Sequence, residues 1–479
     1  MNTSQEAFIL RLPDELLNRI IGEACSTLHE NPWKHKWQLF HGHADAVKLQ
    51  AALCLVCRRF YPIAMPYLYA DLSAECYMYQ SMDPDWQARA ERVPKLLHRS
   101  MKQNPALWPL CRRLDVWYNE DYRGASEARQ ATANPFAFLA ADYLTWFTGL
   151  RALLFHGAVK GRPWELIRLA LENCASLAEL DLSVSGSGDY SLDLAKVVDL
   201  LSEVPCPQLR VLGVNGISKE GGRFMSLKLR EKAGTATFTS LRTRSFLQVP
   251  SVLEDLVRWP KALEQIKIKH TFSECYAYPS LYREWSLATL HPILAIHKST
   301  LRRISIRCIN RAGLAGFDLR EFPNLEDLKL SALTTCRNRE HRYTPEYQYI
   351  PNLLAPRLRI FRWDLTLEDQ QCSEQLEDFA QREEDFLRAF ASAAVQAASP
   401  SSLREIRVKF TPDAYVWDAD ALYPWDRMDA VDREFRDRGI RVKYNAPTAT
   451  QEEFSVMCER KRRDDEERAL KKKEQAEAA

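Results

Sequence analysis

Near its N-terminus the chain carries an apolar stripe with the period of a helix. Between residues 14 and 24 the apolar side chains recur three and four positions apart, at Leu16, Leu17, Ile20, Ile21 and Ala24. The stripe is preceded by a proline, which lacks the N–H that has no partner in a first helical turn. A single helix of this length is marginal on its own, so we expect the stripe to pack against a second element.

That second element is predicted between residues 53 and 72. Leu53, Val56, Cys57 and Phe60 share one helical face, and the prolines predict a break at Pro62 before a second turn or short helix. Two such helices can close a small bundle. A bundle this small leaves an apolar patch that needs a partner, although the alternative, that these side chains only pack their own bundle, stays open.

The rest of the chain repeats the pattern Leu-x-x-apolar-x-apolar, whose last three positions alternate as in a short strand. The clear copies begin at Leu150, Leu177, Leu209, Leu263, Leu301, Leu325, Leu358 and Leu403. Weaker copies begin at Cys111 and Leu241, and residues 439–445 predict a final strand. The spacing between copies is irregular.

Between the copies the period changes to that of helices. Leu194, Val197, Val198 and Leu201 share one face, and Ser251 with Glu254 has the spacing of a capping box. Alternating strands and helices predict an α/β fold, either a stacked solenoid or a doubly wound sheet. The leucine at a fixed offset before each strand resembles a leucine-rich repeat and favours an irregular solenoid with long helices.

The N-terminal segments resemble a known family. Leu12-Pro13-Asp14-Glu15-Leu16-Leu17 with Ile20, followed by Val56-Cys57-Arg58-Arg59-Phe60, is similar to the F-box pattern Leu-Pro-x-Glu-Leu, a helix, and Val-Cys-Lys/Arg-x-Trp. The continuation to Leu72 resembles the fungal variety, and the match covers residues 8–72. The chain departs from the family by a longer segment at residues 26–50 and by Phe60 in place of the usual Trp.

The resemblance implies a function as well as a fold. It implies docking onto a Skp-type adaptor, and through it onto a cullin ubiquitin ligase. The implied docking residues are Leu12, Pro13, Leu16, Ile20, Val56, Cys57 and Phe60. The chain would then be a substrate-recognition subunit that positions a target protein for ubiquitylation. The alternative is a leucine-rich-repeat scaffold for protein interactions with no ligase role.

Composition limits the other classes of function. The chain has 479 residues and a formal net charge of +2, so no global attraction to nucleic acid follows. No window is apolar for long enough to cross a bilayer, and the 12 cysteines are scattered, so we expect no membrane partner and a cytoplasmic or nuclear location. The usual catalytic and phosphate-loop motifs are missing, which predicts no enzyme activity and no cofactor.

A zinc site is the remaining metal hypothesis. Cys54 and Cys57 lie near His29, His35, His41 and His43 in the sequence. Both cysteines fall in an apolar helical stretch, where cysteine acts as a small hydrophobic residue, so we predict no metal site.

Strand geometry predicts which residues point away from the core. In the later copies the outward positions are largely basic: Lys267, Lys269, Arg307, Lys329, Arg362, Arg407 and Lys409. Asp327, Asp364 and Glu405 are expected to dilute this charge without cancelling it. If the strands line one concave surface, it would receive an acidic or phosphorylated segment of a target protein; the alternative is that these cations only keep the surface soluble.

The predicted organisation is therefore a small helical F-box at residues 8–72, an irregular solenoid at 105–445 and a charged tail at 446–479 that is helical or disordered. Residues 334–351 and 413–425 are expected to be surface excursions. The tail carries basic clusters at residues 461–463 and 471–473, which form either a two-part nuclear import signal or a solvated helix.

Overall fold

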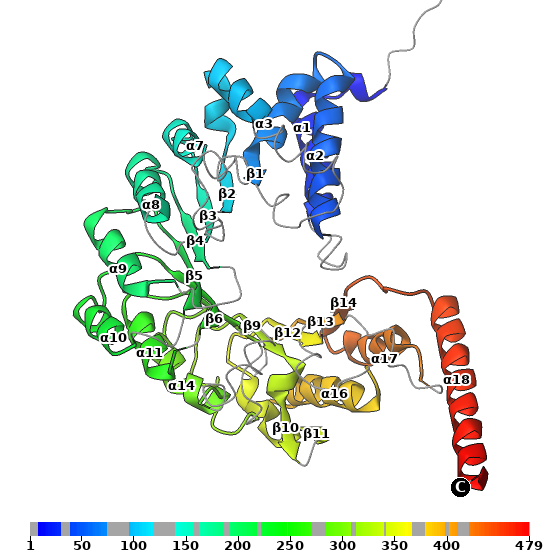
Figure 1. The fold of residues 1–479 in the computed structure, drawn as a ribbon. Coiled ribbons are helices and arrows are strands. Elements are labelled where there is room, and N and C mark those ends of the chain that lie inside the picture. Colours follow the sequence, from blue (N-terminus) through cyan, green and yellow to red (C-terminus); the bar gives the residue numbers. More distant parts are fainter. Residues whose placement is uncertain are drawn as a thin grey trace, which may run out of the picture. The chain divides into compact units, whose positions relative to one another are not determined.

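The computed structural model contains one long sheet and its covering helices (Figure 1). It describes residues 8–29, 39–73, 95–117, 139–157, 162–184, 192–217, 222–246, 248–269, 284–307, 313–339, 342–365, 379–397, 402–410 and 421–478. The chain divides into two compact units, Met1–Asn215 and Gly216–Ala479, with the boundary inside strand β5.

The first unit begins with the helices η1 (Phe8–Arg11), α1 (Asp14–His29), α2 (Leu39–Val56) and α3 (Phe60–Ala70). Helix α1 starts directly after Pro13, as predicted, and the Pro13 carbonyl accepts a hydrogen bond from the amide of Leu17 at 3.0 Å. The predicted break at Pro62 is wrong, because α3 contains both Pro62 and Pro66. Pro62 lies in the first turn, where an amide needs no helical partner, and the chain turns instead before Phe60.

The strands of the first unit alternate with helices. The elements are β1 (Asp71–Ser73), η3 (Pro105–Leu110), β2 (Arg113–Trp117), α7 (Ala140–Trp146), β3 (Ala152–His156), α8 (Arg162–Asn173), β4 (Glu179–Ser183), α9 (Leu194–Glu203) and β5 (Val211–Ile217). Neighbouring strands from β1 to β5 pair in parallel.

The second unit continues the alternation. Its first elements are α10 (Gly222–Glu231), β6 (Ser240–Phe246), α11 (Pro250–Arg258), β7 (Gln265–Lys269), α14 (Leu287–Ala295), β8 (Arg303–Arg307) and β9 (Asp327–Ser331). Next come η4 (Ala332–Thr335), β10 (Cys336–Arg339), β11 (Arg342–Pro345), η5 (Tyr347–Leu353), β12 (Ile360–Leu365) and α16 (Gln381–Gln396). The chain then forms β13 (Glu405–Phe410), α17 (Pro424–Arg436), the final strand β14 (Arg441–Tyr444) and α18 (Gln451–Ala478).

The strand order separates the two folds considered for this sequence. Twelve strands follow one another in sequence order in a single sheet, interrupted only by the antiparallel hairpin β10–β11, which forms a sheet of its own. A doubly wound sheet reverses its order at a switch point, and this sheet does not. The protein is thus an α/β protein with a parallel sheet, consistent with a solenoid-like repeat.

The repeat leucines explain how the strands are held. All eight leading leucines are buried, and each lies three residues before the first buried position of its strand. In β12 the inward side chains pack on α16: Phe361 stacks on Phe390 at 4.1 Å between ring centroids, and Trp363 stacks on Phe386 at 4.7 Å. Stacked repeats therefore share one core between strands and helices.

One weak copy of the repeat was placed in the wrong register. Leu241 was expected to be the leading residue, but it lies within β6 and pairs with Ile266 of β7. The buried Phe238 occupies the leading position instead. The three-residue shift moves Arg242 to an outward position.

Three smaller expectations are also wrong. In α9 the expected burial of Leu194, Val197 and Val198 is confirmed, but Leu200 is buried in place of Leu201, which is only half-buried. Helix α11 begins with Pro250 and has no side-chain cap, so Ser251 and Glu254 form no capping box, and Glu254 pairs with Arg258 at 2.7 Å. Within 334–351 the structure has the β10–β11 hairpin, but Thr335 and Ile350 are buried, so the segment is more than a surface excursion.

Candidate functional site

The N-terminal helical module, made of α1, α2 and α3, has a complete core of its own. Its buried residues are Leu17, Ile21, Cys25, Cys54, Phe60 and Ala64. Leu12 and Cys57 are partly buried against this core. The two sequence segments that carry the family resemblance are therefore folded together.

One side chain joins the two segments directly. The Arg59 guanidinium donates through Nε to Asp14 Oδ1 at 2.9 Å and through Nη2 to the Leu12 carbonyl at 2.5 Å. Across the module, the Tyr67 hydroxyl donates to the Asn18 carbonyl at 3.1 Å. A Cβ at Gly22 would lie 2.7 Å from that hydroxyl, so the glycine permits the close approach of α1 and α3.

Several large apolar side chains of this module are left out of its core. Leu16 is 47% exposed, Ile20 44%, Leu55 85% and Val56 59%. Leu16 and Ile20 lie one turn apart on α1, so they share a face that is distinct from the buried face of Leu17 and Ile21. Exposed apolar residues gathered on so small a module are typical of a protein-interaction surface.

The seven predicted docking residues fall into three groups. Pro13, Leu16, Ile20 and Val56 are exposed, while Leu12 and Cys57 are half-buried. Phe60 is buried in the module's core, so its inclusion as a docking residue has to be corrected: it holds the helices together and offers no surface to a partner.

The zinc hypothesis gains no support from the described residues. They contain no group of three or more His, Cys, Asp or Glu that could hold a metal ion. His35 lies outside the described residues, and the side chains of His29, His41 and His43 are not described. Cys54 is buried, and this burial raises the pKa of its thiol, which disfavours the thiolate that zinc requires.

The second candidate surface is a row of strand residues in the second unit. Strand pairing aligns Arg242, Lys267, Ser305, Lys329, Arg362, Arg407 and Lys443, and we call these seven residues the basic row because six of them are basic. They alternate with the buried strand residues, so they point away from the core, as predicted for Lys267, Lys329, Arg362 and Arg407.

From β9 to β14 the cations of this row are paired with carboxylates. Arg362 donates two hydrogen bonds from Nε to the Asp327 carboxylate, each at 2.9 Å. Glu405 accepts from Arg407, and it also pairs with Lys443 at 2.8 Å. Desolvation raises the pKa of Glu405, but these two cations together hold it below its usual value. The expectation that the acids only dilute the charge is therefore wrong at this end of the sheet.

Asp364 is the buried counter-charge in the middle of the surface. It is fully buried, and its Oδ2 lies 2.8 Å from Lys329 Nζ and 3.2 Å from Arg307 Nε. Desolvation raises the pKa of Asp364, but Lys329, Arg307 and Lys409 together hold it below the usual value. Arg307, predicted as an outward contact, is itself buried in this ion pair.

Around Lys267 of β7 the balance is different. Desolvation, followed by the nearby cations Lys329, Arg242, Lys269 and Arg307, lowers the pKa of Lys267 to about 8. Within the described part of the chain, no carboxylate forms an ion pair with Lys267, which is exposed. We call Lys267 and its four neighbouring cations, Arg242, Lys269, Arg307 and Lys329, the basic cluster. Of them, sequence analysis missed Arg242 because of the shifted register, and it also missed Lys443 at the other end of the row.

In the first unit a set of polar side chains lies on strands β2 to β5. His156 Nε2 lies 3.1 Å from Asp115 Oδ1, and its Nδ1 is hydrogen-bonded to Ser183 Oγ. Beside them, Asn215 donates to Asp181 at 2.5 Å. These residue types also form nucleophilic sites, but Ser183 is buried and its hydroxyl is held by His156. The group is best explained as a set of polar bonds between neighbouring strands.

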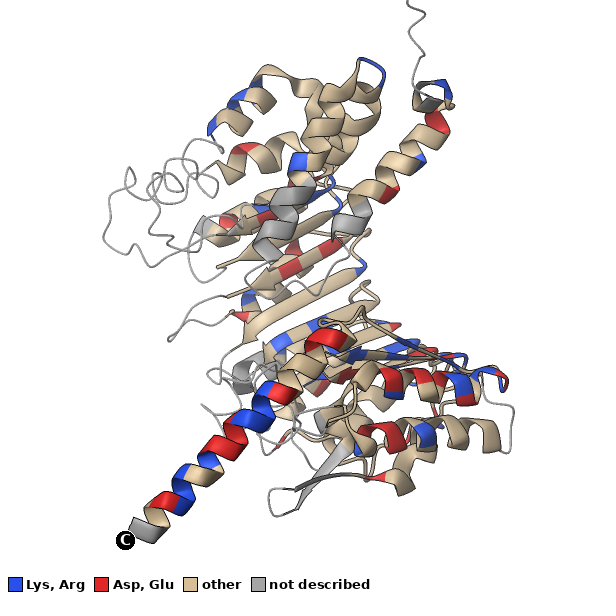
Figure 2. Cartoon of the chain, turned by 90° about the vertical axis from the view of Figure 1, so that its right-hand side faces the viewer, with Lys and Arg blue, Asp and Glu red and all other residues tan. Residues whose placement is uncertain are grey.

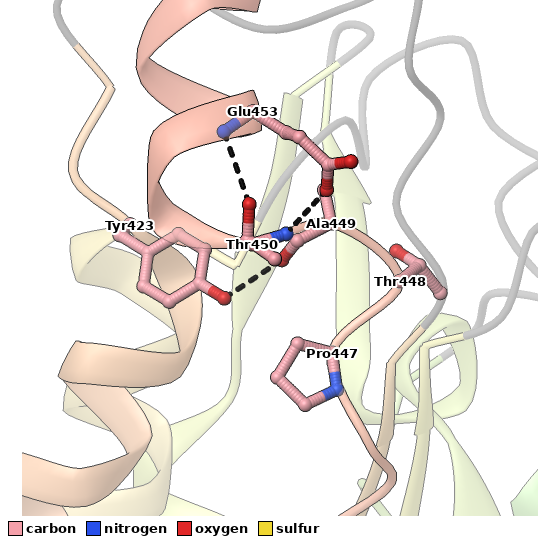
Figure 3. Close-up of a pocket in the computed structure, with 6 residues that line it drawn as sticks. All are labelled: Tyr423, Pro447, Thr448, Ala449, Thr450 and Glu453. Atoms are coloured by element: carbon pink, nitrogen blue, oxygen red, sulfur yellow. Dashed lines mark hydrogen bonds between the residues drawn. The ribbon is translucent and has the colours of Figure 1, made fainter.

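A hollow of about 390 Å³ lies where α18 begins (Figure 3). The Tyr423 hydroxyl donates to the Ala449 carbonyl at 2.8 Å, and Thr450 and Glu453 form a reciprocal capping box with distances of 3.2 and 2.8 Å. Phe454 and Cys458 are buried at this joint, whereas the later part of α18 alternates acidic and basic residues along an exposed helix (Figure 2). Since the polar groups that line the hollow form hydrogen bonds with one another, we interpret these residues as the structural connection that holds the start of α18.

Comparison with known proteins adds little to this geometry. No family profile matches the chain, and no curated protein matches it. Among solved structures, the chain is similar to a protein chain in the crystal structure of the Rad7 and Elc1 complex in yeast. The two chains share 11% sequence identity, the match covers 92% of this chain and 98% of that chain, and the TM-score is 0.29. None of the helices in the described ranges is long and apolar enough to cross a membrane.

Proposed function

We propose that the chain is the substrate-recognition subunit of a Skp-cullin-F-box ubiquitin ligase. In this proposal the N-terminal helical module is an F-box of the fungal type that binds a Skp-type adaptor. The sheet of the later strands binds a target protein and holds it near the ligase. In this proposal the chain contributes to the reaction by positioning the target, and no catalytic residue or cofactor of its own is invoked.

The observation that carries the proposal is the state of the N-terminal helical module. Its core is complete without Leu16, Ile20, Leu55 and Val56, and these side chains remain exposed. Burying a large apolar side chain is worth about 1.5–3 kcal/mol. A partner that covered all four would gain enough to form a specific complex, and these residues belong to or adjoin the two segments that resemble the F-box.

The experiment is a binding measurement between the full chain and a purified fungal Skp-type adaptor. We expect a complex in equal proportions that survives gel filtration. Failure of the wild-type chain to bind any fungal Skp-type adaptor at micromolar concentration would leave the alternative, a repeat scaffold with no ligase role.

A further inference from the structure

The outer part of helix α18, residues 459–476, has no buried face. The base of the helix is anchored, because Phe454 and Cys458 are buried. From residue 459 to residue 476 every residue is exposed, apart from the half-buried Lys461. Most protein helices are stabilised by an apolar stripe that packs on a core. Leu470 is the one large apolar residue of this outer part and is itself exposed, so another source of stability is required.

Ion pairs between successive turns provide that stability. Lys461 Nζ lies 2.8 Å from Asp465 Oδ1. Glu459 accepts hydrogen bonds from Arg462 Nη1 at 2.9 Å and from Arg463 Nε at 3.5 Å. Basic and acidic blocks follow one another along the helix (Figure 2). Pairs of opposite charge one turn apart stabilise even isolated helices.

The sequence extends this pairing beyond the pairs just described. Opposite charges stand four positions apart at residues 459 and 463, 460 and 464, 461 and 465, 462 and 466, 463 and 467, 464 and 468, and 467 and 471. Between residues 459 and 471 the spacing of charges therefore matches one helical turn almost without interruption.

We propose that residues 459–471 form a free-standing helical arm, held by ion pairs along its own length and needing no partner for its shape. At about 1.5 Å of rise per residue, the arm holds the lysines at residues 471–473 about 20 Å from the anchored turn at Cys458. The arm is a spacer of fixed length. This inference does not depend on the ligase proposal.

The arm also gives the basic residues at 461–463 a structural role. Their cations pair with Asp465 and Glu459 inside the helix. They stabilise the arm in its folded form, as the interpretation of the tail as a solvated helix requires.

The test measures the distance between two spin labels on the full chain by pulsed electron–electron resonance. Ketone-bearing amino acids at the exposed positions Val456 and Gln475 carry the labels, so the native cysteines stay unmodified. A continuous helix places the two positions about 28 Å apart. We expect one narrow distance peak near this value, lengthened by the label linkers. A broad distribution in the wild type would refute the arm.

A four-lysine variant tests whether ion pairs hold the helix. Asp464→Lys, Asp465→Lys, Glu466→Lys and Glu467→Lys together place like charges one turn apart, although lysine favours helices at least as well as the acids that it replaces. We expect the distance distribution to become at least twofold broader. Salt at about 1 M, where the Debye length is about 3 Å, should narrow it again. A four-lysine variant as narrow as the wild type would overturn the role of the ion pairs.

The matched control is Asp464→Glu/Asp465→Glu, which changes two of the same positions and keeps their charges. It should retain the narrow peak, and broadening in this control would count against the inference. The four-lysine variant should keep its thermal unfolding midpoint within a few degrees of the wild type, since all four replaced residues are exposed. A larger fall would show that the arm packs on the fold and is not free-standing.

Protein concentration separates a free-standing arm from a helix that pairs with a second copy. The wild-type distance distribution should stay the same over a tenfold range of concentration. A peak that becomes narrow only at the higher concentration would assign the stability of the helix to association between copies and would overturn the inference.

Discussion

Replacing Leu16 and Ile20 together by alanine tests how the N-terminal helical module binds its partner. Both side chains lie on the exposed face of α1, and slightly less than half of each is open to solvent. Full burial of such a side chain is worth about 1.5–3 kcal/mol, so covering the exposed part of each contributes roughly 1 kcal/mol. The double variant should therefore lose about 2 kcal/mol of binding free energy, which is roughly a 30-fold increase in Kd.

The fold should tolerate this change. Because the buried face of α1 is formed by Leu17 and Ile21, the Leu16→Ala/Ile20→Ala variant should keep its thermal unfolding midpoint within a few degrees of the wild type. Leu17→Ala is the contrasting change, since Leu17 is fully buried and its truncation should cost about 2–5 kcal/mol of stability.

The assay is biolayer interferometry with an immobilised Skp-type adaptor, run beside differential scanning fluorimetry. Leu422→Ala serves as the matched control, because Leu422 is an exposed leucine of the second unit and should leave the Kd unchanged. The reasoning is refuted if the double variant binds as tightly as the wild type, or if Leu422→Ala weakens binding to the same extent.

Three further changes probe the rest of the fold. Asp364→Asn should destabilise the second unit by about 3–5 kcal/mol in urea unfolding, because Arg307 and Lys329 lose their buried counter-charge. The pKa of Asp364 is lowered in the folded protein, so the stability difference between wild type and variant should be largest above the unfolded pKa of 3.8 and should shrink as the pH falls further. The pKa of Lys267 falls from 10.5 to about 8 on folding, so the unfolded chain binds more protons than the folded chain between pH 8 and pH 10.5. The stability of the wild type relative to Lys267→Gln should therefore rise across this range, and a pH-independent difference would contradict this. Phe454→Ala should free the base of α18 and speed its cleavage in limited proteolysis, whereas Val456→Ala, at an exposed position, should not; equal cleavage of the two would count against the packed joint.

Most strands of the long sheet could be predicted from sequence because they carry a local signal, whereas β1, β10 and β11 were not predicted. The leading leucine and the two following apolar residues lie close together in sequence and recur at eight strands, so they can be recognised even though the spacing between copies is irregular. The signal fails where the leading residue is not leucine. Phe238 takes the place of the leading leucine before β6, and Leu241, three residues later, was assigned as the leading residue instead.

Helix ends were less predictable, because the local sequence is compatible with more than one starting residue. Pro62 is acceptable in the first turn of a helix as well as in a break, and the tertiary packing of Phe60 against α1 and α2 decides between them. Likewise, Pro250 starts α11 one residue before Ser251, so the serine has no role as a cap.

Leu16, Ile20 and Val56 of the candidate docking surface were named from sequence, whereas the exposed Leu55 was missed and the separation of these residues from the core was not predicted. Leu16 and Leu17 are neighbours in one stripe, yet only Leu17 is buried. Similarly, charge pairing depends on strand register: Arg362 reaches Asp327, which is 35 residues earlier in the chain, because β12 pairs with β9. No local pattern reveals such a pair.

Site-specific photo-crosslinking tests the central claim most directly. A benzophenone amino acid is placed at Ile20 of the N-terminal helical module and, in a second protein, at the exposed Leu227 of α10. Illumination in the presence of the Skp-type adaptor should join the adaptor to the chain labelled at position 20 and leave the chain labelled at position 227 unlinked. Crosslinking at position 227 with none at position 20 would contradict the assignment of this module as the adaptor-binding site.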